Sequence, residues 1–392
     1  MTPLELSASL FSCHERFSLM HLSPICCKHS FLLPELRNIV GGSKAMFFMQ
    51  EAGKSLEGRS INRVIFGKGP VNVLLWSQMH GDEPTATLAL MDIFSFLAQN
   101  KSEPWVVRLS ESITAHFIPL LNPDGAERFR RFTAAGIDMN RDARNLATPE
   151  ANVLREAHQL LRPAFGFNLH DQGLSSVGAA PSVTALSLLA PAVDEARSMP
   201  MVRIKAMRVG ALIARVVNQF AAGHIATYDD TFEPRAFGDT MQRLGTSTIL
   251  IESGQWPEDP EKKFIRKMNF VSILTALHAI GDGSYQDVEL EHYTGLVQNG
   301  KRMFDLIVRD LEITRADGWT TTSDVGLLIQ PQGEQTSEVP NVNSLYAVKE
   351  IGDLKDFGGL STFDASARTI QADAIGIDKS FRLKELKDLL QL

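Results

Sequence analysis

Hydrophobic and polar positions along the chain fall into two kinds of pattern that alternate. Short runs rich in β-branched and aromatic residues predict strands; they lie at 47–66 and 71–77 (two strands around a turn), 113–121, 165–170 and 247–253. Apolar residues at helical spacing predict helices at 85–97, 150–161 and 199–222, near 260–280 and near 287–311. This alternation predicts an α/β protein whose central sheet is covered by helices on both faces.

The pattern changes at both ends of the chain. Residues 1–45 have mixed character and end in Gly-Gly-Ser-Lys, which predicts an N-terminal extension. Residues 312–392 contain short strand-like pieces between Gly, Pro, Asn and Asp, with a helical pattern only in the last dozen residues. We therefore expect three parts: the extension 1–45, a main domain at 46–311 and a small β-rich C-terminal domain at 312–392.

Composition and charge narrow the classes of partner. The formal net charge of -7 argues against a nucleic-acid partner, because phosphate binding needs a concentrated basic surface. No stretch reaches the roughly 20 apolar residues of a membrane span, and the N-terminus lacks the pattern of a signal peptide. All 3 cysteines lie in the first 27 residues, so a disulfide framework is not expected. We expect a cytoplasmic protein without a membrane partner; a homo-oligomer remains open.

Metal-ligand chemistry is suggested by polar residues that follow predicted strands. His80 and Glu83, in the segment SQMHGDEPTA, come directly after the apolar run VNVLLW and form a H-x-x-E pair. Zinc accepts imidazole and carboxylate ligands, and a catalytic zinc usually has three protein ligands. His170 ends another candidate strand, FGFNLH, and is the best third ligand. The alternatives are a helix-starting acid at Glu83 and ordinary buried histidines.

A further acidic residue lies inside an apolar strand pattern. Glu252 occurs in STILIESG, and a buried strand carboxylate is costly unless it has a function. The alternative interpretation is a buried salt bridge with one of the arginines. The sequence thus offers two histidines and two glutamates at or near the ends of strands.

Five motifs occur in order over residues 46–282. They are His80-x-x-Glu83, Asn122-Pro123-Asp124-Gly125, Gly136-Ile137-Asp138-Met139-Asn140-Arg141, His170 and Glu252. Together they resemble the zinc carboxypeptidase family, typified by carboxypeptidase A, and are most similar to its compact bacterial members. The resemblance implies a mixed, largely parallel central sheet with helices on both faces, in addition to the β-rich C-terminal domain.

The resemblance also implies roles at the reacting bond. His80, Glu83 and His170 would hold one Zn²⁺ per chain and leave an open position for water. Glu252 would be the general base that takes a proton from that water and delivers it to the leaving amine. Arg131, or alternatively Arg130, would polarise the scissile carbonyl.

Further residues are implied to bind the substrate. Asn140 and Arg141 would hold its terminal carboxylate, for which a guanidinium offers a bidentate fork. Tyr228 is the candidate for a mobile tyrosine that closes over the substrate, with a loop aromatic packed on the core as the alternative. Asp82 departs from the digestive enzymes, which have an arginine there. Asp171, next to His170, could orient a ligand, although a solvated acid at a strand end is the expected reading.

The sequence therefore predicts a zinc-dependent carboxypeptidase-like hydrolase. Its substrate would be a small peptide or amino-acid conjugate with a free carboxylate. One alternative is an N-acyl-amino-acid deacylase of the aspartoacylase or succinylglutamate desuccinylase type. Those proteins share this arrangement of metal ligands and often carry a β-rich C-terminal domain. The other is a non-catalytic zinc-binding protein.

Overall fold

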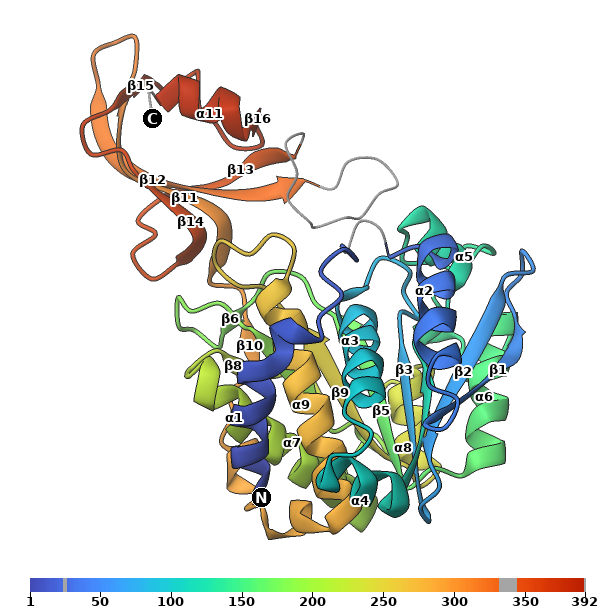
Figure 1. The fold of residues 1–392 in the computed structure, drawn as a ribbon. Coiled ribbons are helices and arrows are strands. Elements are labelled where there is room, and N and C mark those ends of the chain that lie inside the picture. The colour runs from blue at the N-terminus through green and yellow to red at the C-terminus, as the bar shows by residue number, and fades with distance from the viewer. Residues whose placement is uncertain (24–26, 331–343, 391–392) are drawn as a thin grey trace.

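The computed structural model describes residues 1–23, 27–330 and 344–390, and an eight-stranded mixed sheet forms its centre (Figure 1). The strand order is β1-β2-β4-β3-β5-β9-β7-β8, in which β4-β3-β5-β9 and β7-β8 are parallel and the remaining neighbours antiparallel. The strands are β1 (Phe47–Lys54), β2 (Ser60–Gly67), β3 (Val71–Ser77), β4 (Ile113–Ile118), β5 (Phe165–Asp171), β7 (Leu186–Leu189), β8 (Ile225–Thr227) and β9 (Ser247–Ser253). The predicted fold class is confirmed.

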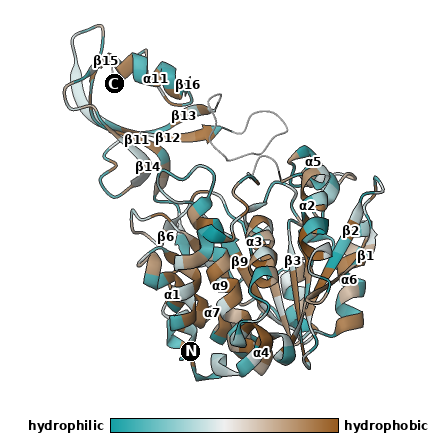
Figure 2. Ribbon diagram, in the orientation of Figure 1, coloured by the Kyte–Doolittle hydropathy of each residue, from teal (hydrophilic) through white to brown (hydrophobic). Residues whose placement is uncertain are grey.

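Helices cover both faces of this sheet. Alternate residues of a strand point to opposite sides, and in the central strands both sets are apolar and need to be buried. In β3, Val73 and Leu75 belong to one buried cluster, and Leu74 and Trp76 belong to another. The first cluster packs under α3 (Thr85–Gln99), α7 (Met201–Phe220) and α9 (Lys263–Asp282), the second under α6 (Pro149–Leu161) and α8 (Phe237–Arg243). Figure 2 shows α7 and α9 as largely hydrophobic, which fits their burial.

The N-terminal residues pack into the main core. Leu6 and Leu10 of α1 (Pro3–Cys13) and Leu32 and Leu36 of α2 (His29–Gly41) are buried in the same cluster as the central strands. α1 packs against α9, and α2 packs against α3 (Figure 1). The extension is thus built into the fold of the main domain.

A buried ionic network fixes this N-terminal segment. Asp92 on α3 accepts hydrogen bonds from Arg266 on α9 (2.5 and 2.7 Å). It lies 3.0 Å from His14 Nε2 and accepts a bond from the Leu19 amide. Arg266 also donates to the Leu22 carbonyl, so one ion pair holds three segments that are distant in sequence.

One local expectation was wrong. The helix expected near 287–311 is confined to α10 (Glu291–Thr294), and residues 303–314 instead form strand β11, which pairs with strands on both sides. The Asn122-Pro123-Asp124-Gly125 motif begins α5 (Pro123–Arg128), because the Asn122 side chain caps the Gly125 amide and proline suits a first helical position. The shorter elements also include α4 (Pro104–Ser112), β6 (Ser176–Val177) and β10 (Asn299–Gly300).

The C-terminal region forms a second sheet with its own buried cluster. Its strand order is β14-β11-β12-β13-β16, and β15 pairs with β11. The elements are β11 (Met303–Thr314), β12 (Thr320–Gln330), β13 (Leu345–Gly352), β14 (Gly358–Asp364), β15 (Thr369–Gln371), β16 (Ser380–Arg382) and α11 (Leu383–Leu390). β11 crosses the expected boundary at 311/312, and the three-part division remains a prediction. No helix in the described ranges is long and apolar enough to cross a membrane.

Candidate metal centre

The candidate site lies at the carboxyl ends of three adjacent parallel strands. His80 follows β3, His170 lies near the end of β5, and Glu252 lies near the end of β9. His170 and Glu252 are direct partners in the β5–β9 register. Open α/β sheets place their sites at this edge, because the strand ends and the loops after them meet there. The structure therefore brings together residues that the sequence separates by up to 172 positions, from 80 to 252.

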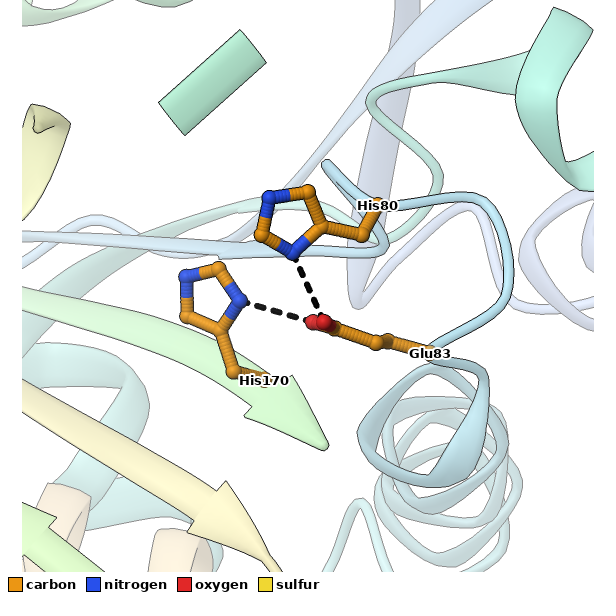
Figure 3. Close-up of side chains that lie close together, drawn as sticks. All are labelled: His80, Glu83 and His170. Atoms are coloured by element: carbon orange, nitrogen blue, oxygen red, sulfur yellow. Dashed lines mark hydrogen bonds and ion pairs between the residues drawn. The ribbon is translucent and has the colours of Figure 1, made fainter. Parts of the chain in front are cut away.

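His80, Glu83 and His170 form a compact buried group (Figure 3). The Nδ1 atoms of His80 and His170 each lie 2.7 Å from one oxygen of the Glu83 carboxylate. One ligand atom from each residue can be chosen so that all lie within 4.8 Å of one another. Two imidazole nitrogens and a carboxylate are a donor set that zinc accepts. The residues therefore fit the metal that the sequence motifs imply.

The loop that carries His80 and Glu83 has a tightly constrained main chain. Gln78 adopts a left-handed conformation (φ 52°), and its side-chain amide donates to the Gly81 carbonyl at 2.9 Å. A Cβ at Gly81 would lie 2.0 Å from the Gly125 carbonyl carbon, so only glycine fits there. The Asn122 amide donates to the Met79 carbonyl at 3.2 Å. These contacts explain why the Asn122-to-Gly125 motif accompanies the H-x-x-E motif.

Asp138 orients His80 from the outer side. Its Oδ1 lies 3.0 Å from His80 Nε2, while its Oδ2 accepts bonds from Arg131 at 3.1 and 3.2 Å. Burial alone would raise the pKa of Asp138, but His80 and Arg131 hold it well below its usual range. An acceptor at Nε2 fixes the ring so that Nδ1 faces Glu83. The sequence motif contains Asp138, but its role becomes visible only in three dimensions.

Arg131 lies beside the candidate ligands. Its Nη1 is 3.3 Å from Glu83 Oε1, and its carbonyl accepts a long bond (3.5 Å) from the Asn122 side chain. Although burial lowers the pKa of Arg131, the surrounding carboxylates, Asp82 among them, raise it overall. The main-chain amide of Arg130 donates to the Gly125 carbonyl. Of the two arginines, Arg131 is the one with a described guanidinium contact to a candidate ligand.

Glu252 is a buried carboxylate at the same edge. Across residues 1–23, 27–330 and 344–390 it has no hydrogen-bond or ion-pair partner, which contradicts the alternative of a buried salt bridge with an arginine. Burial, followed by the charge of Glu83, raises the pKa of Glu252 to about 8. Such a carboxylate is well placed to exchange a proton near neutral pH.

Residues 35–170 match the model of the zinc carboxypeptidase family. This segment is zinc carboxypeptidase-like. It includes His80, Glu83 and His170 but ends before Glu252. The placement of Glu252 beside His170 therefore rests on the register between β5 and β9 and not on the family match. The resemblance noted in the sequence is thus confirmed.

Curated relatives match over short spans. The chain is 25% identical over 146 residues to "Probable carboxypeptidase 2" of Trichophyton verrucosum, covering 35% of this chain and 28% of the relative. It is 35% identical over 65 residues to "Carboxypeptidase SOL1" of Arabidopsis thaliana, covering 16% of this chain and 13% of the relative. The match therefore spans under a third of the length of these relatives.

A solved structure supports the fold over a longer span. A metallo-carboxypeptidase from Burkholderia cenocepacia superposes with a TM-score of 0.50 and 14% identity. The match covers 64% of this chain and 69% of that one. At this identity the similarity establishes the fold alone.

Asp171 corrects an expectation from the sequence. Instead of a solvated acid at a strand end, it is a buried carboxylate that accepts bonds from Thr85 Oγ1 (2.5 Å) and Lys262 Nζ (3.2 Å). Its own amide lies 3.3 Å from Glu83 Oε2. Asp171 thereby joins the start of α3, the end of β5 and the start of α9 around the metal ligands.

The residues expected to hold a substrate carboxylate lie on one loop. Asn140 is fixed through its side-chain oxygen, which accepts a bond from the Phe237 amide at 3.0 Å. Arg141 is partly exposed, donates to the Asn140 carbonyl and lies 3.7 Å from Glu233. A second guanidinium, that of Arg235, also pairs with Glu233. Two arginines thus share the Glu233 carboxylate at this rim.

Tyr228 lies at the border between site and solvent. It is 38% exposed, and its main-chain amide bonds to the Leu188 carbonyl. Burial, and then the charges of Glu252 and Glu83, raise the pKa of Tyr228. The phenol is therefore close enough to interact electrostatically with the carboxylates of the site, while its side chain remains partly exposed to solvent.

Proposed function

We propose that the protein is a zinc-dependent carboxypeptidase-like hydrolase that cleaves an amide bond next to a free carboxylate. The observation that carries this proposal is the meeting of His80, Glu83 and His170 with an unpaired Glu252 on the neighbouring strand. A zinc ion held by the first three would supply a Lewis acid at the reacting bond. One such ion per chain fits the single cluster found among the described residues.

Glu252 moves the proton in this proposal. Its carboxylate accepts a proton from the attacking water and returns it to the departing amine nitrogen. Burial and the charge of Glu83 raise the pKa of Glu252, which favours the uptake of a proton. Arg131 donates to the carbonyl oxygen where negative charge develops, and Asp138 holds its guanidinium in place.

Asn140 and Arg141 bind the free carboxylate, which selects a terminal residue over an internal one. Tyr228 closes the site from the solvent side and excludes water. Substrates in this proposal are small peptides or amino-acid conjugates. The cytoplasmic location remains a prediction from composition.

A product screen by mass spectrometry tests the proposal. The zinc-loaded protein is incubated with a pool of ordinary peptides, γ-glutamyl peptides and N-acyl amino acids, with and without a chelator. Chelator-sensitive release of C-terminal residues supports the carboxypeptidase function. Release of acyl groups alone would replace it with the N-acyl-amino-acid deacylase function, and no release from any pool would favour a non-catalytic zinc-binding protein.

A further inference from the structure

A cavity of about 200 Å³ lies between the loop after β9 and the C-terminal sheet. Figure 1 shows this sheet standing over the end of the main domain where α9 begins. A second cavity of about 460 Å³ adjoins it, and the two share three lining residues. Those shared residues are Gln255, Asp305 and Ile329.

Asp305 brings a carboxylate without a cation to both cavities. Its Oδ2 accepts a hydrogen bond from the Ile329 amide at 2.7 Å, and no lysine, arginine or histidine in the described parts of the chain forms an ion pair with it. Burial raises the pKa of Asp305. Burial and then the charge of Asp305 raise the pKa of Tyr346, so the phenol lies near the carboxylate. Keeping a mostly buried carboxylate without a counter-ion is costly unless a ligand supplies one.

The other lining groups favour a cation on an aliphatic stem. Tyr346 offers an aromatic ring, to whose face cations are attracted, whereas the Trp256 ring packs against Phe264 and His224. Carboxylates outnumber ammonium groups in the two linings: Glu258, Asp259, Asp305 and Glu350 against Lys262 and Lys301. The Lys262 ammonium is already paired with Asp171.

The cavities adjoin the catalytic edge of the sheet. Gln255 lies three residues after Glu252, in the loop that follows β9. Lys262 contacts Asp171, which is the neighbour of the candidate ligand His170. A peptide whose last amide bond lies at His80, Glu83 and His170 would reach the cavities if its preceding residues ran along the loop after β9 toward the C-terminal sheet.

We infer that the paired cavities around Asp305 bind an organic ammonium or guanidinium group that the substrate carries on the amino side of the scissile bond. The assignment of this cation to the substrate rests on the proposed function. A lysine side chain, an arginine side chain or a free α-ammonium would each supply such a cationic group. The C-terminal sheet thus contributes to substrate selection through Asp305 and Tyr346.

The test compares matched peptides on the zinc-loaded full-length Glu252→Gln protein, in which binding is measured by calorimetry without turnover. The two peptides of a pair differ at one position before the C-terminal residue, where one has lysine and the other has uncharged norleucine. Each pair is made once with a free and once with an acetylated amino terminus. At least one cationic peptide should bind about ten-fold or more tightly than its neutral partner, as expected for a hydrogen bond to a charged group. Asp305→Asn should remove this preference and leave the norleucine affinity unchanged.

Two further variants make the result decisive. Asp317→Asn, at the exposed turn between β11 and β12, should keep the preference. Ser361→Lys, on an exposed position that lines the cavity, should abolish the preference by supplying a tethered ammonium. Equal binding of all pairs, no peptide binding, or a preference that survives Asp305→Asn would overturn the inference.

The remaining arms separate this inference from the proposed function. N-acetyl-lysine amide is also titrated, as a cation that is not part of a peptide. If this compound binds in an Asp305-dependent way and none of the peptides does, the site binds a small amine and the assignment of the cation to the substrate is wrong. The same peptides are also given to the wild-type protein. Hydrolysis without preference would refute only the cation site. Preference without hydrolysis would refute the proposed function and the assignment of the cation to a substrate, but would keep the cation site.

Discussion

Replacing Asp138 tests whether His80 is held for metal binding. In Asp138→Asn, one oxygen can still face His80 Nε2 and the Asn140 amide, which lie 3.0 and 2.9 Å from Oδ1. The new amide group, however, meets the Arg131 guanidinium donor to donor, where Oδ2 now accepts two bonds. Loss of such an outer partner typically weakens metal binding by about 10- to 100-fold, or about 1.4–2.8 kcal/mol.

We therefore expect about ten-fold weaker zinc binding for Asp138→Asn and up to about 100-fold for Asp138→Ala, which removes both oxygens. Hydrolysis at saturating zinc should fall as well, because Arg131 loses its support. Zinc affinity is measured by competition with a chromophoric chelator at fixed pH. Glu233→Gln is the control: this carboxylate pairs with Arg141 and Arg235 and bonds to no candidate ligand, so its zinc affinity should stay at the wild-type value.

The result that would refute this reasoning is an unchanged zinc affinity in both Asp138 variants. It would mean that Asp138 does not set the orientation of His80. Reduced hydrolysis with unchanged zinc affinity would confine Asp138 to positioning Arg131.

Other predictions concern the base, a ligand and the N-terminal segment. Glu252→Gln should keep its zinc, measured by atomic absorption, and lose turnover by about 100-fold or more; full activity would remove Glu252 from the chemistry. His80→Ala should lose zinc, and full metal occupancy would show that a ligand is misplaced. Asp92→Asn should lower the free energy of unfolding by about 3–5 kcal/mol in denaturant titrations, because it leaves Arg266 buried without its partner. Burial raises the pKa of Asp92, but His14 and Arg266 hold it below its usual value, so its contribution is present above about pH 4 and is lost on further acidification. The stability difference between wild type and Asp92→Asn should therefore shrink at acid pH, and a difference independent of pH would exclude this network as its source.

The central strands could be predicted from the sequence for a clear physical reason. β3, β5 and β9 are buried on both faces, so each reads as a continuous apolar run bounded by polar residues. The carboxyl ends of such strands meet, which predicts that His80 and His170 lie together, and the family resemblance adds Glu252 to them.

The errors arose where local pattern and tertiary pairing disagree. Residues 303–314 contain consecutive apolar positions that suit a helix as well as a strand, and pairing with β12 and β14 decides between them. The division at residues 1–45 stays a prediction, although apolar positions of α1 and α2 enter the main core. Whether an apolar helix face is covered depends on its partners, which the local pattern does not contain.

The partners of the candidate ligands were also beyond the sequence. Asp138 is 58 residues from His80, and Lys262 is 91 residues from Asp171. Neither pairing follows from strand ends or from motif spacing. The sequence indicates a solvated Asp171, because a position directly after a strand is often exposed; in the structure the starts of α3 and α9 bury its carboxylate.

The central claim is that His80, Glu83 and His170 hold the zinc. Crystals of the zinc-loaded protein, measured on both sides of the zinc absorption edge, test it most directly. The account predicts one anomalous peak per chain, about 2.0–2.2 Å from Nδ1 of both histidines and from the Glu83 carboxylate. A peak at another group of residues, or none at these three at full zinc loading, would contradict it.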